Sequence, residues 1–115
     1  MITLDEYQRR AAETAIYPDA GDADSAHGLA YVALGLAGEA GEIANKAKKV
    51  LRDDAGVITD EARMRIIFEL GDVLWYVAQT ATQLGADLES IAGINIAKLA
   101  SRSERGTLQG SGDSR

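Results

Sequence analysis

Apolar residues recur every three to four positions in four stretches of the chain, and this spacing gives a helix one apolar face. Each stretch is bounded by residues that start or stop helices. The pattern predicts an all-α fold, an antiparallel bundle of about four helices per protomer that oligomerisation completes. The predicted helices span residues 3 to about 17, 27 or 28 to 52, 59 or 60 to 84, and 87 or 88 onward.

Local signals mark the ends of these helices. Thr3 and Glu6 form a capping box at the first helix, and Pro18 stops that helix because the residue before a proline is pushed out of the α region. Gly85 supplies the stop of the third helix. We expect a helical domain at residues 1–105 and a flexible Gly/Ser-rich tail at 106–115, either disordered or able to order over a ligand.

Two acidic pairs interrupt the apolar faces of the two long helices. Glu39 and Glu42 lie in the second helix, and Glu69 and Asp72 lie in the third. At about 100° per residue, Glu39 and Glu69 point close to the direction of the apolar stripe of their helices. The i, i+3 spacing lays both carboxylates of a pair on one face. Two such helices in contact offer up to four carboxylates to one inter-helix space.

A solvated acidic edge is the alternative, and a single pair of this kind is usually that. Two pairs are harder to explain as packing, because a carboxylate that faces a core is costly unless it is paired or holds a metal. Only Lys46 and Arg65 lie near the pairs, and two cations do not balance four carboxylates. The pairs therefore predict a site for Mg²⁺, with Mn²⁺ as the alternative, since these ions take carboxylate oxygens and substrate phosphates.

Composition narrows the class of function. The length of 115 residues suits one domain, whose core an oligomer interface would extend. A net charge of -6 argues against a nucleic-acid polymer as partner, because a polyanion needs an excess of positive charge on the binding face. The chain has no cysteine for a disulfide or a thiolate metal site. It shows no signal peptide or membrane span, so we expect a cytoplasmic protein without a membrane partner.

Several polar side chains are candidates to contact an anionic ligand. Lys46, four residues after Glu42, is well placed to meet a phosphate. Tyr76 shares the acidic face, although an aromatic residue at this spacing is more often core. Trp75 is expected on the far side, packed on another helix or subunit. A helical spacing gathers four polar residues of the last helix into the one cationic stripe of an acidic chain: Asn95, Lys98, Arg102 and Arg105.

These motifs carry a family resemblance. GLAGEAGEIANKAKK followed by FELGDVLWYVA resembles the E-x-x-E, spacer, E-x-x-D signature of the MazG-like, all-α nucleoside triphosphate pyrophosphohydrolases. NIAKLASR-x-x-RG with its glycine-rich end resembles the C-terminal pattern of small, single-domain members. The resemblance implies a homodimer or homotetramer, cleavage of a (d)NTP between the α and β phosphates, and Mg²⁺ held by Glu39, Glu42, Glu69 and Asp72.

The implied chemistry assigns roles to the candidate residues. Phosphoryl transfer needs charge neutralisation, an aligned water and a stabilised leaving group. We expect a glutamate to act as base, with Glu39 as the first candidate because it faces deepest into the apolar arc and Glu42 as the second. Gln8 is a candidate contact to the nucleobase, with an ordinary surface position as the alternative. The candidate substrate contacts are Lys46, Tyr76, Asn95, Lys98 and Arg102.

Three other functions stay open. Phosphoribosyl-ATP pyrophosphohydrolases and dUTPase-like enzymes share the acidic motif, and nothing in the sequence selects the base. A helical nucleotide-binding protein without catalysis is the third. A di-metal oxidase bundle is disfavoured, because such bundles use Glu-x-x-His pairs and the single histidine, His27, lies outside any such spacing.

Overall fold

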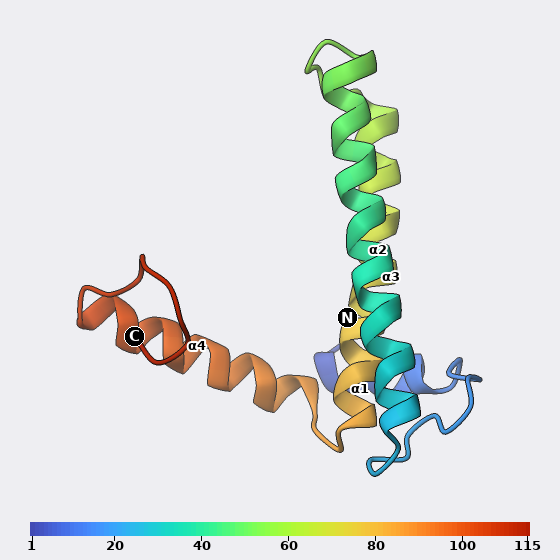
Figure 1. Cartoon of the computed structure of the whole chain (residues 1–115), viewed down its shortest axis with the longest axis vertical. Coiled ribbons are helices and arrows are strands. Elements are labelled where there is room, and N and C mark those ends of the chain that lie inside the picture. Colours follow the sequence, from blue (N-terminus) through green and yellow to red (C-terminus); the bar gives the residue numbers. More distant parts are fainter.

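The computed structural model describes all 115 residues as four helices joined by turns and loops, with no strand (Figure 1). The all-α prediction is confirmed. The structure has all four of the predicted helices: α1 (Leu4–Ala12), α2 (Ala26–Asp53), α3 (Asp60–Gln83) and α4 (Leu88–Glu104). None of them combines the length and the apolar character that crossing a membrane requires.

A side-chain cap begins each helix, and the predicted starts lie within two residues of the observed ones. The cap oxygen accepts the backbone N–H three residues later, at 2.8 to 3.1 Å, and such a cap stabilises a helix by about 1 kcal/mol. Gly85, with φ of +71°, follows the end of α3 as predicted. The four caps are Thr3, Ser25, Thr59 and Asp87.

The first helix ends at Ala12, earlier than the predicted end near Tyr17. The backbone N–H groups of Thr14 and Ala15 bond the carbonyls three residues back, at 3.1 Å each, instead of continuing the helical ladder. The Thr14 hydroxyl also donates to the Ala11 carbonyl at 2.8 Å. These tight turn bonds replace the next helical turn, so Pro18 lies beyond the stop rather than causing it.

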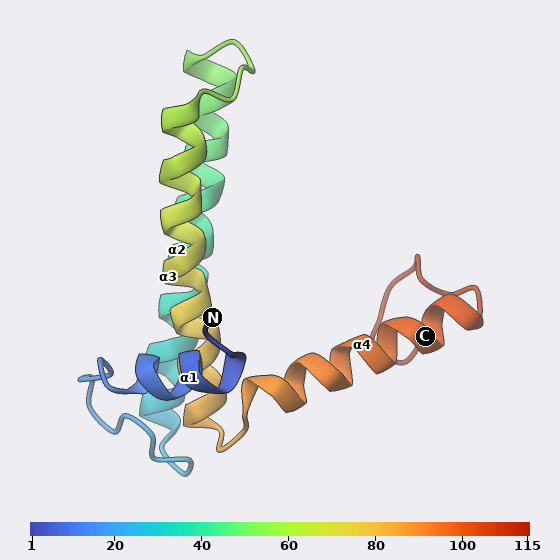
Figure 2. The same cartoon turned by 180° about the vertical axis from the view of Figure 1, so that it is seen from behind.

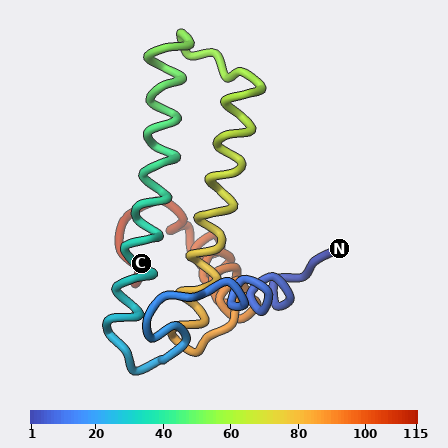
Figure 3. The backbone as a smooth tube through the Cα atoms, turned by 90° about the vertical axis from the view of Figure 1, so that its right-hand side faces the viewer, coloured from blue at the N-terminus to red at the C-terminus, as the bar shows by residue number.

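The long helices α2 and α3 form an antiparallel hairpin (Figures 1 and 3). Helix α1 crosses α3 near the end of the hairpin that is remote from the α2–α3 loop, and α4 leads away from the hairpin (Figure 2). A Cβ on Gly28 would lie 2.5 Å from Gln83 Nε2, and a Cβ on Gly35 would overlap the Tyr76 ring. These two glycines therefore allow the close approach of α2 and α3, whereas Gly38 and Gly41 face open space.

A polar network fastens the α1–α2 loop to α3. The Tyr17 hydroxyl donates to Gln83 Oε1 at 2.6 Å, and Gln79 Nε2 donates to the Tyr17 oxygen at 3.0 Å. Gln83 Nε2 donates to the carbonyls of Asp19 and Asp22 at 3.1 and 2.6 Å. We call Tyr17, Gln79 and Gln83 the polar lock, because all three are buried and bond across elements distant in sequence.

Gln8 is not a surface residue. Its side chain is buried, and its amide nitrogen donates to Thr82 Oγ1 at 3.1 Å and to the Ala86 carbonyl at 2.9 Å. Its oxygen accepts the Leu88 N–H at 2.8 Å. The amide therefore ties α1 to the turn between α3 and α4, and the ordinary surface position considered for Gln8 is wrong.

The apolar core of a single protomer is small. Its centre consists of Ala11, Ala78, Ala81 and Leu88, around which Tyr7, Trp75 and Val77 pack. Large apolar side chains on the hairpin and on α4 remain exposed, among them Leu34 at 73%, Phe68 at 67% and Ile94 at 69%. Exposed apolar surface of this extent is typical of an interface.

Candidate metal and phosphate site

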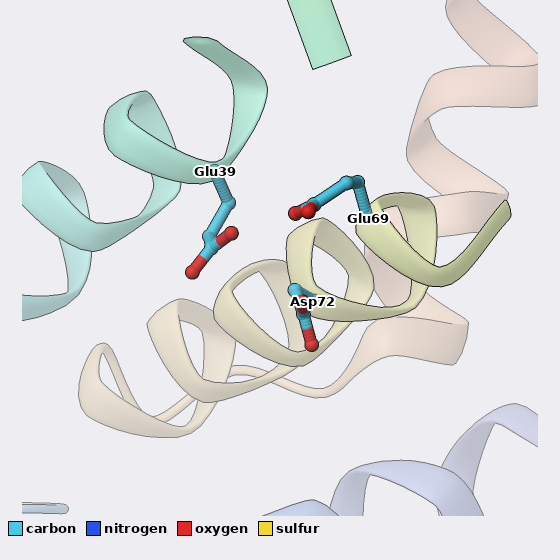
Figure 4. A group of neighbouring side chains, drawn as sticks. All are labelled: Glu39, Glu69 and Asp72. Atoms are coloured by element: carbon cyan, nitrogen blue, oxygen red, sulfur yellow. The ribbon is translucent and has the colours of Figure 1, made fainter. Parts of the chain in front are cut away.

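Three carboxylates from the two long helices meet halfway along the hairpin. Glu39 of α2 faces Glu69 and Asp72 of α3 (Figure 4), and one oxygen of each lies within 4.8 Å of the others. Glu39 and Glu69 are partly buried and Asp72 is exposed. The structure therefore brings together three of the four acidic residues that the sequence singles out.

Glu42 lies outside this group and is connected to it by a lysine. It is exposed, and its Oε2 lies 3.8 Å from Lys46 Nζ. The same Lys46 nitrogen lies 3.0 Å from Glu69 Oε1, so Lys46 bridges both acidic pairs. Arg65, expected beside Glu69, instead pairs with Glu61 at 3.2 Å. Lys46 is thus the cation that offsets the acidic group.

The carboxylates differ in their affinity for a proton. Burial, a hydrogen bond with Glu69 and the nearby charges of Asp72, Glu69 and Glu42 raise the pKa of Glu39. The hydrogen bond from Lys46 lowers the pKa of Glu69 against the effect of burial. Glu39 is therefore the more basic of the two, which is the property that a general base requires.

The donor set fits a hard divalent cation. Carboxylate oxygens are the ligands that Mg²⁺ and Mn²⁺ prefer, and two helices packed through glycines hold them in place. Two of the three carboxylates, those of Glu39 and Asp72, line an open cleft of about 340 Å³ together with Thr14, Trp75 and Tyr76. A cleft of this kind offers room for substrate beside a cation.

Tyr76 lies at the cleft, as its predicted position on the acidic face requires, and its ring packs against Gly35. Trp75 also lines the cleft, so its predicted position on the far side is wrong, whereas its predicted packing on another helix is confirmed by its contact with the core that includes Ala11 of α1. Its indole Nε1 donates to Thr14 Oγ1 at 2.7 Å, and the two aromatic rings meet edge to face at 4.9 Å. This hydrogen bond joins the indole to the turn that follows α1. The sequence signal for the position of Trp75 at the cleft is its i, i+3 spacing from Asp72, which places both side chains on one side of the helix.

The cationic stripe does not lie at the carboxylates of the same protomer, because α4 leads away from the hairpin (Figure 1). Asn95 is exposed, whereas Lys98 and Arg102 contact the residues that follow α4. Lys98 Nζ lies 3.2 Å from Asp113 Oδ1, and an Arg102 nitrogen donates to the Asp113 carbonyl at 2.8 Å. Arg105 donates to the Arg115 carbonyl at 3.0 Å.

Residues 29–107 match the family model described as MazG nucleotide pyrophosphohydrolase domain, and the chain belongs to that family. The chain is 60% identical over 112 residues to "Gene 37 protein" of Mycobacterium phage L5, covering 97% of this chain and 98% of that protein. No solved structure matches the chain.

Proposed function

We propose that this protein is a Mg²⁺- or Mn²⁺-dependent nucleoside triphosphate pyrophosphohydrolase. It would cleave a (d)NTP between the α and β phosphates and release the monophosphate and pyrophosphate. The observation that carries the proposal is the convergence of Glu39, Glu69 and Asp72 within 4.8 Å in a chain of the MazG family.

The acidic, basic and aromatic residues of the site have different proposed roles. Glu39, Glu69 and Asp72 would hold the cation, with Glu42 at the rim, and the bound cation would neutralise charge on the phosphate oxygens. Glu39, or Glu42 as the alternative, accepts the proton of the attacking water. Lys46, whose nitrogen lies 3.0 Å from Glu69, would give up this contact if a metal ion were held there and would bind a phosphate oxygen instead. Tyr76 contacts the substrate in the cleft.

The site requires a second copy of the chain. Lys98 and Arg102, the expected polyphosphate contacts, lie on α4 together with Asn95, and α4 of the same protomer leads away from the carboxylates. The exposed apolar side chains of the hairpin and α4 would be covered in the same assembly. We infer a homodimer, or a homotetramer built from it, in which one copy brings its cationic stripe to the acidic group of the other.

The reaction is tested by measuring pyrophosphate and orthophosphate released from a panel of (d)NTPs, dUTP and phosphoribosyl-ATP included, with Mg²⁺ and with EDTA. Metal-dependent pyrophosphate is expected, and the ranking across the panel identifies the base. Glu39→Gln is expected to abolish the release. Glu61→Gln is the matched control, because Glu61 is an exposed α3 glutamate paired only with Arg65. Nucleotide binding without any product would instead support a non-catalytic protein.

Sharing of the site between copies is tested by complementation. Glu39→Gln and Lys98→Glu chains, each inactive alone, are co-expressed. If each site takes its acidic group and its cationic stripe from different copies, a mixed dimer retains one native site, and about a quarter of the activity returns. No return of activity would place both groups on one copy and contradict the shared site. The cytoplasmic location expected from the sequence remains a prediction.

A further inference from the structure

The segment that follows α4 returns along the helix and covers its cationic end (Figures 1 and 2). Gly106, Gly110 and Gly112 have φ values of +71°, +132° and +86°, a region that other residues rarely adopt. Arg115 fastens the return path by donating to the carbonyls of Thr107, Leu108 and Gly112. The path is therefore held by its own bonds.

The returning segment places a carboxylate on the two residues expected to bind phosphate. Asp113 Oδ1 lies 3.2 Å from Lys98 Nζ and 3.5 Å from an Arg102 nitrogen. Those two cations lower the pKa of Asp113, with Lys98 the larger cause. The side chains of Asp113 and Lys98 are 89% and 39% exposed, whereas that of Arg102 is 5% exposed, so an anion from solution reaches Arg102 only when the segment moves aside.

The segment provides hydrogen-bond partners for only part of the Arg102 side chain. Arg102 is only 4% exposed, yet a single terminal nitrogen makes all its bonds, to the Gly112 and Asp113 carbonyls and to Asp113 Oδ1. Its Nε is buried without a hydrogen-bond partner, and so is the hydroxyl of nearby Thr107, whose N–H bonds the Arg102 carbonyl. A guanidinium binds a phosphate through two nitrogens at once, which would supply the missing partner.

We propose that residues 110–115 form a displaceable strap whose Asp113 carboxylate occupies the anion site of Lys98, Arg102 and Thr107 until a polyphosphate displaces it. The proposal rests on the proposed function in taking the substrate polyphosphate as the displacing anion. The strap competes with substrate, so the apparent affinity for a polyphosphate is reduced by the fraction of molecules in which the strap is seated.

The test uses inorganic tripolyphosphate as probe, titrated calorimetrically into the full chain in EDTA, so that neither metal nor turnover contributes. Asp113→Asn is expected to lower the dissociation constant by about 3- to 10-fold, because it removes the competing charge. Asp24→Asn is the matched control: Asp24 is an exposed aspartate of the α1–α2 loop, and the change removes the same charge. It is expected to leave binding unchanged.

A second measurement follows the strap itself. The backbone amides of Gly112 and Asp113 in the native chain are expected to shift and broaden in NMR spectra as tripolyphosphate is added. Equal or weaker binding by Asp113→Asn, or amides that do not respond, would overturn the strap. Nucleotide cleavage with no effect of Asp113→Asn rejects the strap alone. A clear effect of Asp113→Asn without cleavage of any nucleotide rejects the hydrolase proposal alone.

Discussion

Replacement of Gly35 by alanine is expected to damage the site without touching a carboxylate. A Cβ at this position would lie 2.7 Å from Tyr76 Cδ1, with two other ring atoms closer still, whereas ordinary contact begins near 3.4 Å. The ring must therefore move by more than 0.7 Å, the difference between those two distances. Gly35 lies one turn from Glu39, and Tyr76 lies one turn from Asp72. The helices consequently separate where their carboxylates meet.

The net effect on stability combines two opposed terms. Alanine in place of glycine favours a helix by about 1 kcal/mol, and overpacking against a rigid ring costs about 1 to 3 kcal/mol. We expect Gly35→Ala to lower the free energy of unfolding by up to about 2 kcal/mol. A displacement near 1 Å is also expected to lower the rate of pyrophosphate release by about 100-fold, because the reacting groups lose their alignment.

Urea unfolding followed by circular dichroism at one protein concentration measures the first effect, and pyrophosphate release measures the second. Gly41→Ala is the control: it lies on the same helix beside Glu42 but has nothing within 4 Å. The Gly35→Ala, Tyr76→Ala double variant lacks the ring, so the part of the stability loss that the clash causes is expected to disappear. A Gly35→Ala protein as stable and as active as Gly41→Ala would refute the packing argument.

Four further predictions concern single side chains. In EDTA, Glu39→Gln is expected to raise the melting temperature at pH 7. The pKa of Glu39 is raised above the ordinary 4.5, so the native protein loses stability as pH rises through this raised pKa, and glutamine removes the charge that causes the loss. Glu69→Gln is expected to lower the melting temperature at pH 7, and this loss vanishes as pH falls through the lowered pKa of Glu69. If the two variants changed the melting temperature in the same direction, the opposite pKa shifts of Glu39 and Glu69 would be contradicted. Lys46→Met is expected to tighten Mn²⁺ binding, measured by calorimetry, because it removes the ammonium group 3.0 Å from Glu69, and to reduce kcat/KM. Unchanged Mn²⁺ affinity would contradict the idea that Lys46 and the metal ion compete for the same place beside Glu69. Gln8→Leu is expected to cost about 2 to 4 kcal/mol in urea unfolding, since it strands buried partners, whereas Gln109→Leu in the exposed tail serves as control.

Local chemistry explains which parts of the fold follow from the sequence. Thr3, Thr59 and Asp87 act on backbone groups three residues away, so a short window contains the whole signal. The meeting of Glu39 with the α3 carboxylates follows from helical periodicity combined with antiparallel packing. Both features depend on spacing alone.

The features that the sequence did not reveal depend on partners far along the chain. Trp75 turns toward the cleft because Thr14, 61 positions away, accepts its indole proton. Gln8 is buried because the turn after α3 presents groups that match its amide. The direction of α4 is set at the same turn, and the periodicity of its residues is the same whichever way the helix leaves. Such geometry is a property of the assembled elements.

The polar lock has a consequence for the choice of cation at the proposed metal site. At a rise of about 1.5 Å per residue, Glu39 lies about 16 Å along α2 from Gly28 beside the lock, and Glu69 lies about 21 Å along α3 from Gln83. Because the hairpin is fastened there, a tilt of about 4° between its helices changes the carboxylate separation by about 1 Å. Mg²⁺ and Ca²⁺ differ by about 0.4 Å in their ligand distances. Discrimination between these ions would thus be set by two glutamines and a tyrosine that touch neither ion.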